Sequence, residues 1–111
     1  MIKYEQNHLY LERKVVQFQY VIENALPYKD IVLVLLNSTS SGKKWGEFSN
    51  LYAVTPEGEN LWTAQLPTTN PGDSFYLVKI QDDKIFAYSN WDYICQIDPQ
   101  TGKIVEQIFT K

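Results

Sequence analysis

The residues that most often carry acid–base or metal chemistry are scarce in this sequence. His8 is its only histidine and Cys95 its only cysteine. A structural zinc site draws its ligands mainly from these two residue types, so the sequence predicts no such site. A Ser-His-Asp triad would have to use His8, and we interpret that residue as an ordinary surface histidine. The sequence therefore predicts neither a metal site nor a cofactor.

Several aspartates lie in or beside the expected turns of the second half, and they are Asp82, Asp83, Asp92 and Asp98. Calcium loops place oxygen ligands at alternate positions and close with a glutamate, and this spacing is absent. Short acidic side chains bond their own backbone in turns, which is the interpretation we adopt. The hypothesis of an enzyme with Asp82, Asp83 or Asp92 as acid and base ranks last, and it would require a carboxylate of raised pKa inside a pocket.

Aromatic residues in polar loops are better candidates for function. Trp45 and Phe48 belong to a polar segment between residues 38 and 49, and Trp91 lies in a short turn. An exposed aromatic ring can stack on a sugar or anchor a protein interface. The alternative is that each ring caps the core or contacts a neighbouring subunit. These three residues are the predicted binding residues.

Size and composition predict one globular domain over residues 1–111. The chain has 44% hydrophobic and 14% aromatic residues and a net charge of −3. An acidic chain without a basic patch is not expected to bind nucleic acid. The longest apolar run, Ile31–Leu36, is too short to cross a membrane, and the N-terminus has no apolar signal segment. A cytoplasmic protein without membrane contact is expected, with Cys95 as a small core residue.

The elements that position these residues read as strands joined by turns. In the first half, Val15–Glu23 alternates with period two and predicts a strand, although Leu11, Val15, Phe18 and Ile22 also lie at helical spacing. Residues 24–30 are expected to be a connection. The next run, 31–36, is apolar on both faces, which is typical of a strand covered on both sides. Two further strands are expected at 51–55 and 61–66.

The second half predicts a regular antiparallel meander. Its expected strands are 74–81, 84–89, 93–97 and 103–110. Laid over this meander, the first half forms a matching unit whose excess length lies in its connections. We therefore expect a leading segment at 1–12, which adds an edge strand, and two four-stranded units at 13–67 and 74–111. Pro56 and Pro99 are 43 positions apart, a period typical of propeller blades.

The turns that contain these prolines resemble the repeat of PQQ-like quinoprotein β-propellers, which runs Ala-x-Asp-x-x-Thr-Gly-Lys-x-x-Trp. The second unit keeps Asp98, Thr101, Gly102 and Lys103. The first unit keeps Ala53, Gly58 and Trp62. The second unit departs from the pattern with Glu106 at the tryptophan position, and the first has Thr55 for the aspartate. The quinone chemistry of the family does not transfer, because its enzymes use a much longer chain and a metal site that nothing here matches.

The resemblance implies structural roles for four residues. Asp98 and Thr101 would brace their turn beside Gly102, and Trp62 would pack between neighbouring blades. Two blades do not close a ring, so the expected fold is all-β, with two blade-like meanders closed by homo-oligomerisation. The alternative is a β-sandwich or barrel within a single chain.

The predicted function is a non-catalytic binding module that acts as a homo-oligomer, with a protein or a carbohydrate as ligand. The alternative is a structural or regulatory assembly subunit whose apolar surface serves self-association. Loop aromatics and the missing catalytic constellations favour the first. Loss of ligand on mutating Trp45 and Trp91 with assembly intact would support binding, and loss of assembly would support the subunit role.

Overall fold

The computed structural model describes residues 2–38 and 49–110, and within them the chain is all-β, as predicted. Eleven strands form three antiparallel sheets, with no helix among the described residues. The first sheet has the order β1-β2-β3, with bounds Lys3–Glu5, His8–Tyr10 and Val15–Gln17. The second has the order β4-β5-β6-β7, with bounds Ile22–Tyr28, Ile31–Leu36, Leu51–Val54 and Asn60–Thr63. The third consists of β8 to β11, with bounds Phe75–Gln81, Lys84–Ser89, Tyr93–Ile97 and Ile104–Phe109.

The second and third sheets are the two predicted four-stranded meanders, but the first strand of the earlier unit was predicted wrongly. Val15–Glu23 is not one strand: its start is β3 of the first sheet, and its last residues begin β4. Residues 24–30, predicted as a connection, continue β4 and turn at Lys29, which has a φ of 51°. The connection was predicted because Pro27 usually ends a regular element. Proline is tolerated here because β4 is an edge strand, where one side of the backbone has no ladder partner.

With β4 placed in this way, the two meanders match more closely than the sequence indicated. Ile22 corresponds to Phe75 and Leu36 to Ser89 by a single offset, so β4–β5 and β8–β9 align residue for residue. Both first strands carry an irregularity just after the corresponding residue, between Ile22 and Asn24 and between Phe75 and Leu77. The difference in length lies after Leu36, where the first meander has the longer connection.

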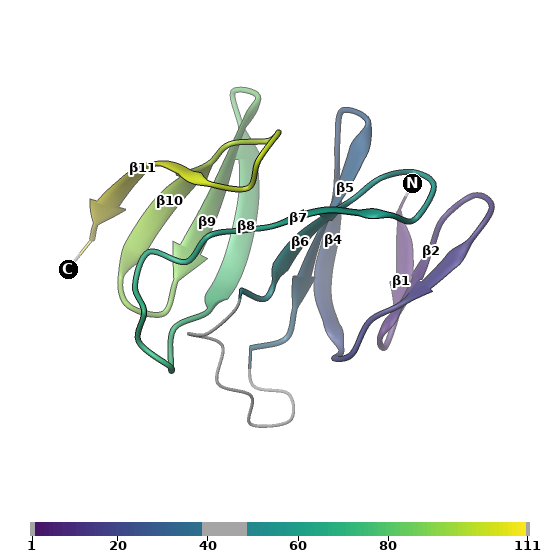
Figure 1. Cartoon of the computed structure of the whole chain (residues 1–111), viewed down its shortest axis with the longest axis horizontal. Coiled ribbons are helices and arrows are strands. Elements are labelled where there is room, and N and C mark those ends of the chain that lie inside the picture. Colours follow the sequence, from purple (N-terminus) through teal and green to yellow (C-terminus); the bar gives the residue numbers. More distant parts are fainter. Residues whose placement is uncertain (1, 39–48, 111) are drawn as a thin grey trace.

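The three sheets lie side by side, with the second in the middle (Figure 1). One buried cluster fills the space between the second and third sheets, with Leu33, Leu35 and Phe75 among its members. A second cluster lies between the first and second sheets and includes Leu9, Val32 and Val34. The core is therefore divided into two layers, one on each face of the middle sheet.

The strand β5 is buried on both faces, as its continuous apolar sequence predicted. The cover comes from within the chain, because the first sheet lies on one face and the third on the other. The double burial of β5 therefore gives no support to ring closure between chains. The segment 1–12, expected to add an edge strand, instead supplies β1 and β2 of a separate sheet. The described residues contain no helix long and apolar enough to span a membrane.

Candidate functional site

Trp62 contacts the third sheet from the second. The resemblance to propeller blades implies such a position between neighbouring units. Trp62 lies in β7, is buried, and its Nε1 donates a hydrogen bond to the carbonyl of Pro99 at 2.9 Å. Its ring packs on Gly102, because a Cβ at that glycine would lie 2.6 Å from Cε3 of Trp62. Nearby, Gln65 N–H donates to the carbonyl of Gly102, and Ile104 N–H donates to Oε1 of Gln65. Through these contacts the β10–β11 turn of the third sheet is fixed to the end of the second sheet.

The turn itself is held by the residues that the pattern singled out. Oδ1 of Asp98 accepts from Gln100 N–H at 2.8 Å, and Oγ1 of Thr101 accepts from Lys103 N–H at 3.3 Å. Gly102 has a φ of 76°, a conformation that costs glycine little and other residues more. Asp98 and Thr101 shape the turn, and the missing side chain of Gly102 admits the tryptophan ring.

A turn glycine also packs on the preceding sheet between the first and second sheets, there against aliphatic side chains and not a tryptophan ring. Gly58, in the β6–β7 turn, has a φ of 89°, and a Cβ there would lie 2.8 Å from Cδ of Lys14 and 3.1 Å from Cγ2 of Val16. Val16 lies in β3, the last strand of the first sheet, as Trp62 lies in the last strand of the second. Each meander therefore places its turn glycine on the last strand of the preceding sheet. This repeated packing supports the relation between the meanders independently of the sequence pattern.

The predicted binding residues do not form one described site. Trp91 is 46% exposed and lies before β10, with its backbone N–H donating to Oγ of Ser89 at 3.0 Å. Its Nε1 would lie 4.0 Å from a Cβ on Gly72, so the ring sits beside the 70–73 connector. Trp45 and Phe48 lie outside the described residues, and their role as binding residues stays a prediction.

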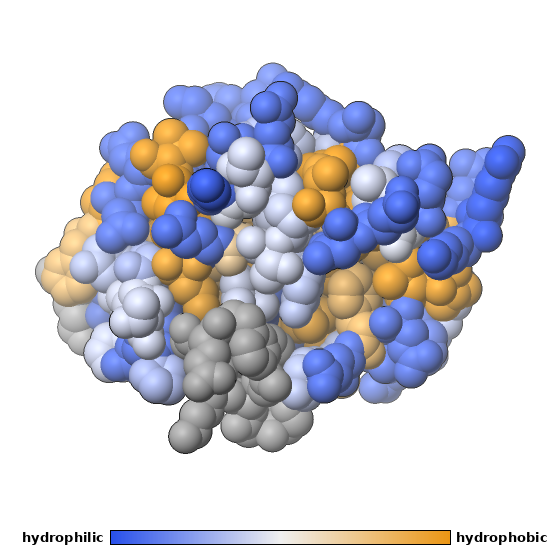
Figure 2. All heavy atoms as spheres, in the orientation of Figure 1, coloured by the Kyte–Doolittle hydropathy of each residue, from blue (hydrophilic) through white to orange (hydrophobic). Residues whose placement is uncertain are grey.

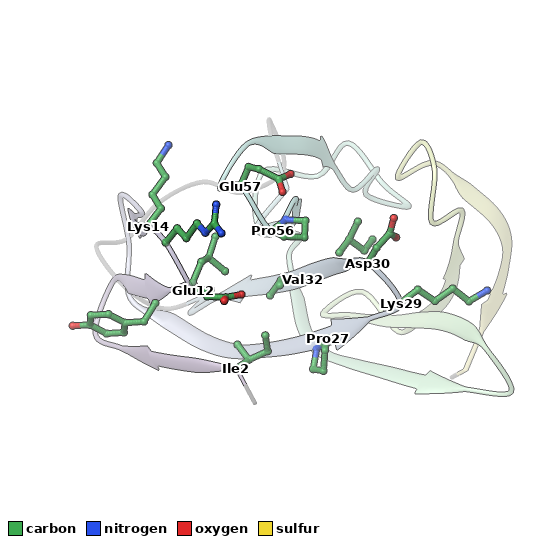
Figure 3. A pocket seen from close by; sticks show the side chains of 13 residues that line it. Ile2, Glu12, Lys14, Pro27, Lys29, Asp30, Val32, Pro56 and Glu57 are labelled. Atoms are coloured by element: carbon green, nitrogen blue, oxygen red, sulfur yellow. The ribbon is translucent and has the colours of Figure 1, made fainter.

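A hollow lies elsewhere, between the first and second sheets (Figure 3). We call it the first groove. It has a volume of about 590 Å³. Its less polar lining comes from Ile2, Tyr10, Leu11, Pro27, Ile31, Val32 and Pro56. Charged side chains of both signs surround these residues: Glu12, Arg13, Lys14, Lys29, Asp30 and Glu57.

A second groove of about 520 Å³ lies on the other side of the β4–β5 turn. It is lined by residues of the first groove together with Tyr28, Thr55, Leu61, Pro99 and Gln100. The two grooves share Lys29, Asp30, Ile31, Pro56 and Glu57. They therefore form adjoining hollows around two neighbouring turns of the middle sheet. Tyr28 also ties this rim to the third sheet, because its hydroxyl donates to the carbonyl of Asp83 at 2.5 Å.

The sequence did not point to this place. Lys29 and Asp30 fall in the segment 24–30 that the sequence predicts as a connection, and Pro56 falls in a predicted turn. Their common location follows from the antiparallel order of one meander, because its β4–β5 and β6–β7 turns lie at the same end of the sheet. The only usable signal was the concentration of prolines and charges in turns, which is too common in β proteins to identify a site.

The residues considered for acid–base chemistry do not converge on the grooves. Asp82 and Asp83 form the β8–β9 turn with φ values of 53° and 64°, and Asp92 has a φ of 67°. His8 stacks on Tyr10, with ring centroids 6.4 Å apart. Within residues 2–38 and 49–110, no group of three histidine, cysteine, aspartate or glutamate side chains is placed to hold a metal ion. Raised pKa values occur at Tyr52, through burial and the neighbouring Tyr20, and at Cys95.

Cys95 is a buried thiol in β10. Burial, with a smaller contribution from the carboxylate of Asp73, raises its pKa from an ordinary value of 9.0 to about 12. Asp73 is itself fully buried and accepts hydrogen bonds from the hydroxyls of Ser89 and Thr68. A protonated, enclosed thiol is a poor nucleophile. Cys95 is therefore a core residue, in agreement with its apolar sequence context.

We expect the thiol of Cys95 to react with a disulfide reagent at pH 8 only after unfolding.

The same thiol should make stability depend on pH. Because the pKa of Cys95 in the folded chain lies above its value in the unfolded chain, the contribution of the thiol to stability is complete below pH 9 and is lost as the pH rises towards 12. The loss should approach about 1.4 kcal/mol per pH unit over that range. Urea titrations from pH 7 to 10.5 on the native chain and Cys95→Ala measure it, since tyrosine titration is common to both. Parallel pH profiles of the two chains would contradict the assignment.

The fold places the chain in the class of all-β proteins built from stacked antiparallel sheets. The chain belongs to the family described as Domain of unknown function (DUF7957), whose model matches residues 1–109. No curated protein and no solved structure matches it. The comparisons identify no propeller family.

Proposed function

We propose that this chain is a non-catalytic binding module whose ligand is a polypeptide segment bound across the two adjoining grooves. The observation that carries the proposal is the shared rim of Lys29, Asp30, Ile31, Pro56 and Glu57, which makes the two hollows adjoin. Two adjoining hollows suit an extended chain better than a compact small molecule.

The chemistry of the lining supports a peptide. Aliphatic and proline side chains offer apolar contact for alternate side chains of an extended segment. Charged side chains of both signs also line the first groove, where they can select a ligand and fix its direction. A nucleic acid would call for an excess of positive charge, whereas the first groove has three basic and three acidic residues.

A random peptide library displayed on phage and selected on the immobilised chain tests this proposal. Selected peptides should bind in solution by fluorescence anisotropy, and the double variant Lys29→Glu/Glu57→Lys should weaken them at least tenfold. Trp91→Ala is the matched control, because it alters an exposed residue away from both grooves and should leave the affinity unchanged. A library that yields no binder, or binders indifferent to the charge exchange, would reject the groove as the site.

A carbohydrate ligand is the second candidate, favoured by the exposed ring of Trp91 beside the 70–73 connector. Stacking on a sugar would make Trp91→Ala the damaging change on a glycan array, with Lys29→Glu/Glu57→Lys neutral. The two ligand classes therefore predict opposite responses in the same pair of variants.

Homo-oligomerisation is also part of the proposal, as is its alternative, a structural or regulatory subunit whose apolar surface serves only self-association. The blade-like repeat and the contact of each turn glycine with the preceding sheet support an arrangement in which sheets stack in series. A cytoplasmic location is proposed on the sequence alone.

A further inference from the structure

The third sheet has one face that no described residue of the other two sheets covers. Its inner face packs on the second sheet through Phe75, Val78, Ile85 and Cys95. Its opposite face, which we call the outer face, carries Leu77, Tyr88, Ile94 and Ile108, with Tyr76 edge-on to Tyr88 at 6.2 Å between centroids. Ile108 is 56% exposed and Tyr76 51%. In Figure 2, apolar side chains reach the surface at the left edge, where Figure 1 places β10 and β11.

The strand register arranges the outer face in two rows that run across the sheet. One row, Leu77–Tyr88–Ile94–Ile108, is apolar along its whole length. The next row is Lys79–Phe86–Gln96–Glu106. It therefore has a positive charge on one edge strand, β8, and a negative charge on the other, β11.

The matching face of the second sheet shows what such a surface does elsewhere in the chain. By the register, Leu35 and Leu51 occupy the positions of Tyr88 and Ile94, and Leu33 that of Phe86. All three leucines are buried against the third sheet. Trp62 of the second sheet packs against the third sheet, and the equivalent position on the outer face is occupied by Glu106. The outer face thus resembles the packing surface of the second sheet, except that Glu106 stands where that sheet has Trp62.

The far end of the stack does not complement this surface. The exposed face of the first sheet carries Lys3, Glu5, His8 and Gln17, with Tyr10 and Val15 as its less polar members. A polar outer face is typical of the capping unit in a stacked protein. Head-to-tail addition would bury these charges against an apolar row, so a continued ring or fibre is disfavoured.

The outer face does complement itself. A twofold axis parallel to the strands, midway between two facing sheets, reverses the strand order and keeps the position along each strand. It sets Leu77 opposite Ile108 of the second copy and Tyr88 opposite its Ile94. It also sets Lys79 opposite Glu106 of the second copy, and Glu106 opposite its Lys79. We propose that the outer face of β8–β11 is the interface of a symmetric dimer of this chain. The proposal specifies the self-association named in the proposed function and does not depend on the grooves.

Size exclusion with light scattering across a concentration series of the full chain provides the test. The native chain should show twice its monomer mass of 12.9 kDa, and Ile108→Glu should halve the observed mass. Val15→Glu is the matched control, because Val15 is 50% exposed on a strand of the first sheet and should leave the dimer intact. Lys79→Glu and Glu106→Lys should each weaken dimerisation by at least tenfold, and the double exchange should restore it.

A monomeric native chain at about 100 μM would overturn the proposal, and so would a dimer that ignores Ile108→Glu. A trimer or larger ring broken by Val15→Glu would replace it with head-to-tail closure. Failure of the double exchange to restore the dimer would reject the twofold geometry. Circular dichroism confirms that each variant is folded. Two further measurements separate failure of the dimer from failure of the groove. Ile108→Glu should still bind the selected peptides, and Lys29→Glu/Glu57→Lys should still have the mass of the dimer.

Discussion

Replacing Trp62 by alanine should lower the free energy of unfolding by about 3 to 5 kcal/mol, the range for removing a large buried aromatic side chain. The ring fills the space over Gly102, and its Nε1 satisfies the carbonyl of Pro99, so the change leaves both a cavity and an unpaired acceptor. Urea unfolding followed by far-ultraviolet circular dichroism measures the loss. Trp91→Ala removes an exposed tryptophan and should change the same quantity by about 0.5 kcal/mol or less.

The partner of this contact gives an independent check. Gly102→Ala should be destabilising for two reasons: its φ of 76° and the approach of 2.6 Å to Trp62. In the Trp62→Ala background the steric part disappears and only the conformational cost remains. The two changes should therefore be non-additive by about 1 to 2 kcal/mol. Additive costs, or a Trp62→Ala chain as stable as the native one, would mean that the second and third sheets are held together elsewhere.

Replacing Asn50 by alanine should lower the free energy of unfolding by about 2 to 4 kcal/mol, because buried groups lose their partners. The Asn50 side chain has no exposed surface. Its Nδ2 donates to the carbonyls of Leu36 and Phe75 at 2.8 Å each, and its Oδ1 accepts from Phe75 N–H at 2.9 Å. Asn50 thus joins the end of β5 to the start of β8. The same urea titration applies, with amide hydrogen exchange at Phe75 as a local measurement.

Asn90→Ala is the matched control for this residue. The Asn90 side chain lies at the surface and donates to Oγ of Ser74 at 2.6 Å. Its loss should cost about 1 kcal/mol, because this side chain makes one hydrogen bond from an exposed position, whereas the enclosed amide of Asn50 makes three. If Asn50→Ala cost no more than Asn90→Ala, or if exchange at Phe75 did not accelerate, the amide would not be the link between the sheets.

The residues that hold the second and third sheets together differ from those substituted in the binding and dimerisation tests. Trp62 and Asn50 act between the second and third sheets. Of the tested positions, Lys29 and Glu57 lie on the groove rim, and Ile108 lies on the outer face, and all three are exposed. Variants at these surface positions should keep the native free energy of unfolding within about 0.5 kcal/mol. Changes in peptide affinity or mass can then be assigned to the surfaces themselves.

Local patterns in the sequence determined the all-β class and most of the strands. The alternation and turn residues of the second half predicted β8 to β11, and the Asp98 to Gly102 turn was recognised from residues whose conformational preferences are local. The apolar run of β5 predicted burial on both faces for the same reason. Each of these properties depends on neighbours in the chain, which a sequence displays directly.

Only the tertiary structure decided which element supplied each partner. The short strands β1, β2 and β3 carry weak patterns, and their role as the cover of β5 depends on packing between distant segments. Pro27 indicated a connection because a sequence does not reveal which strand lies at an edge. The grooves and the outer face arise likewise from the order in which sheets stack, and neighbouring residues along the chain carry no record of it.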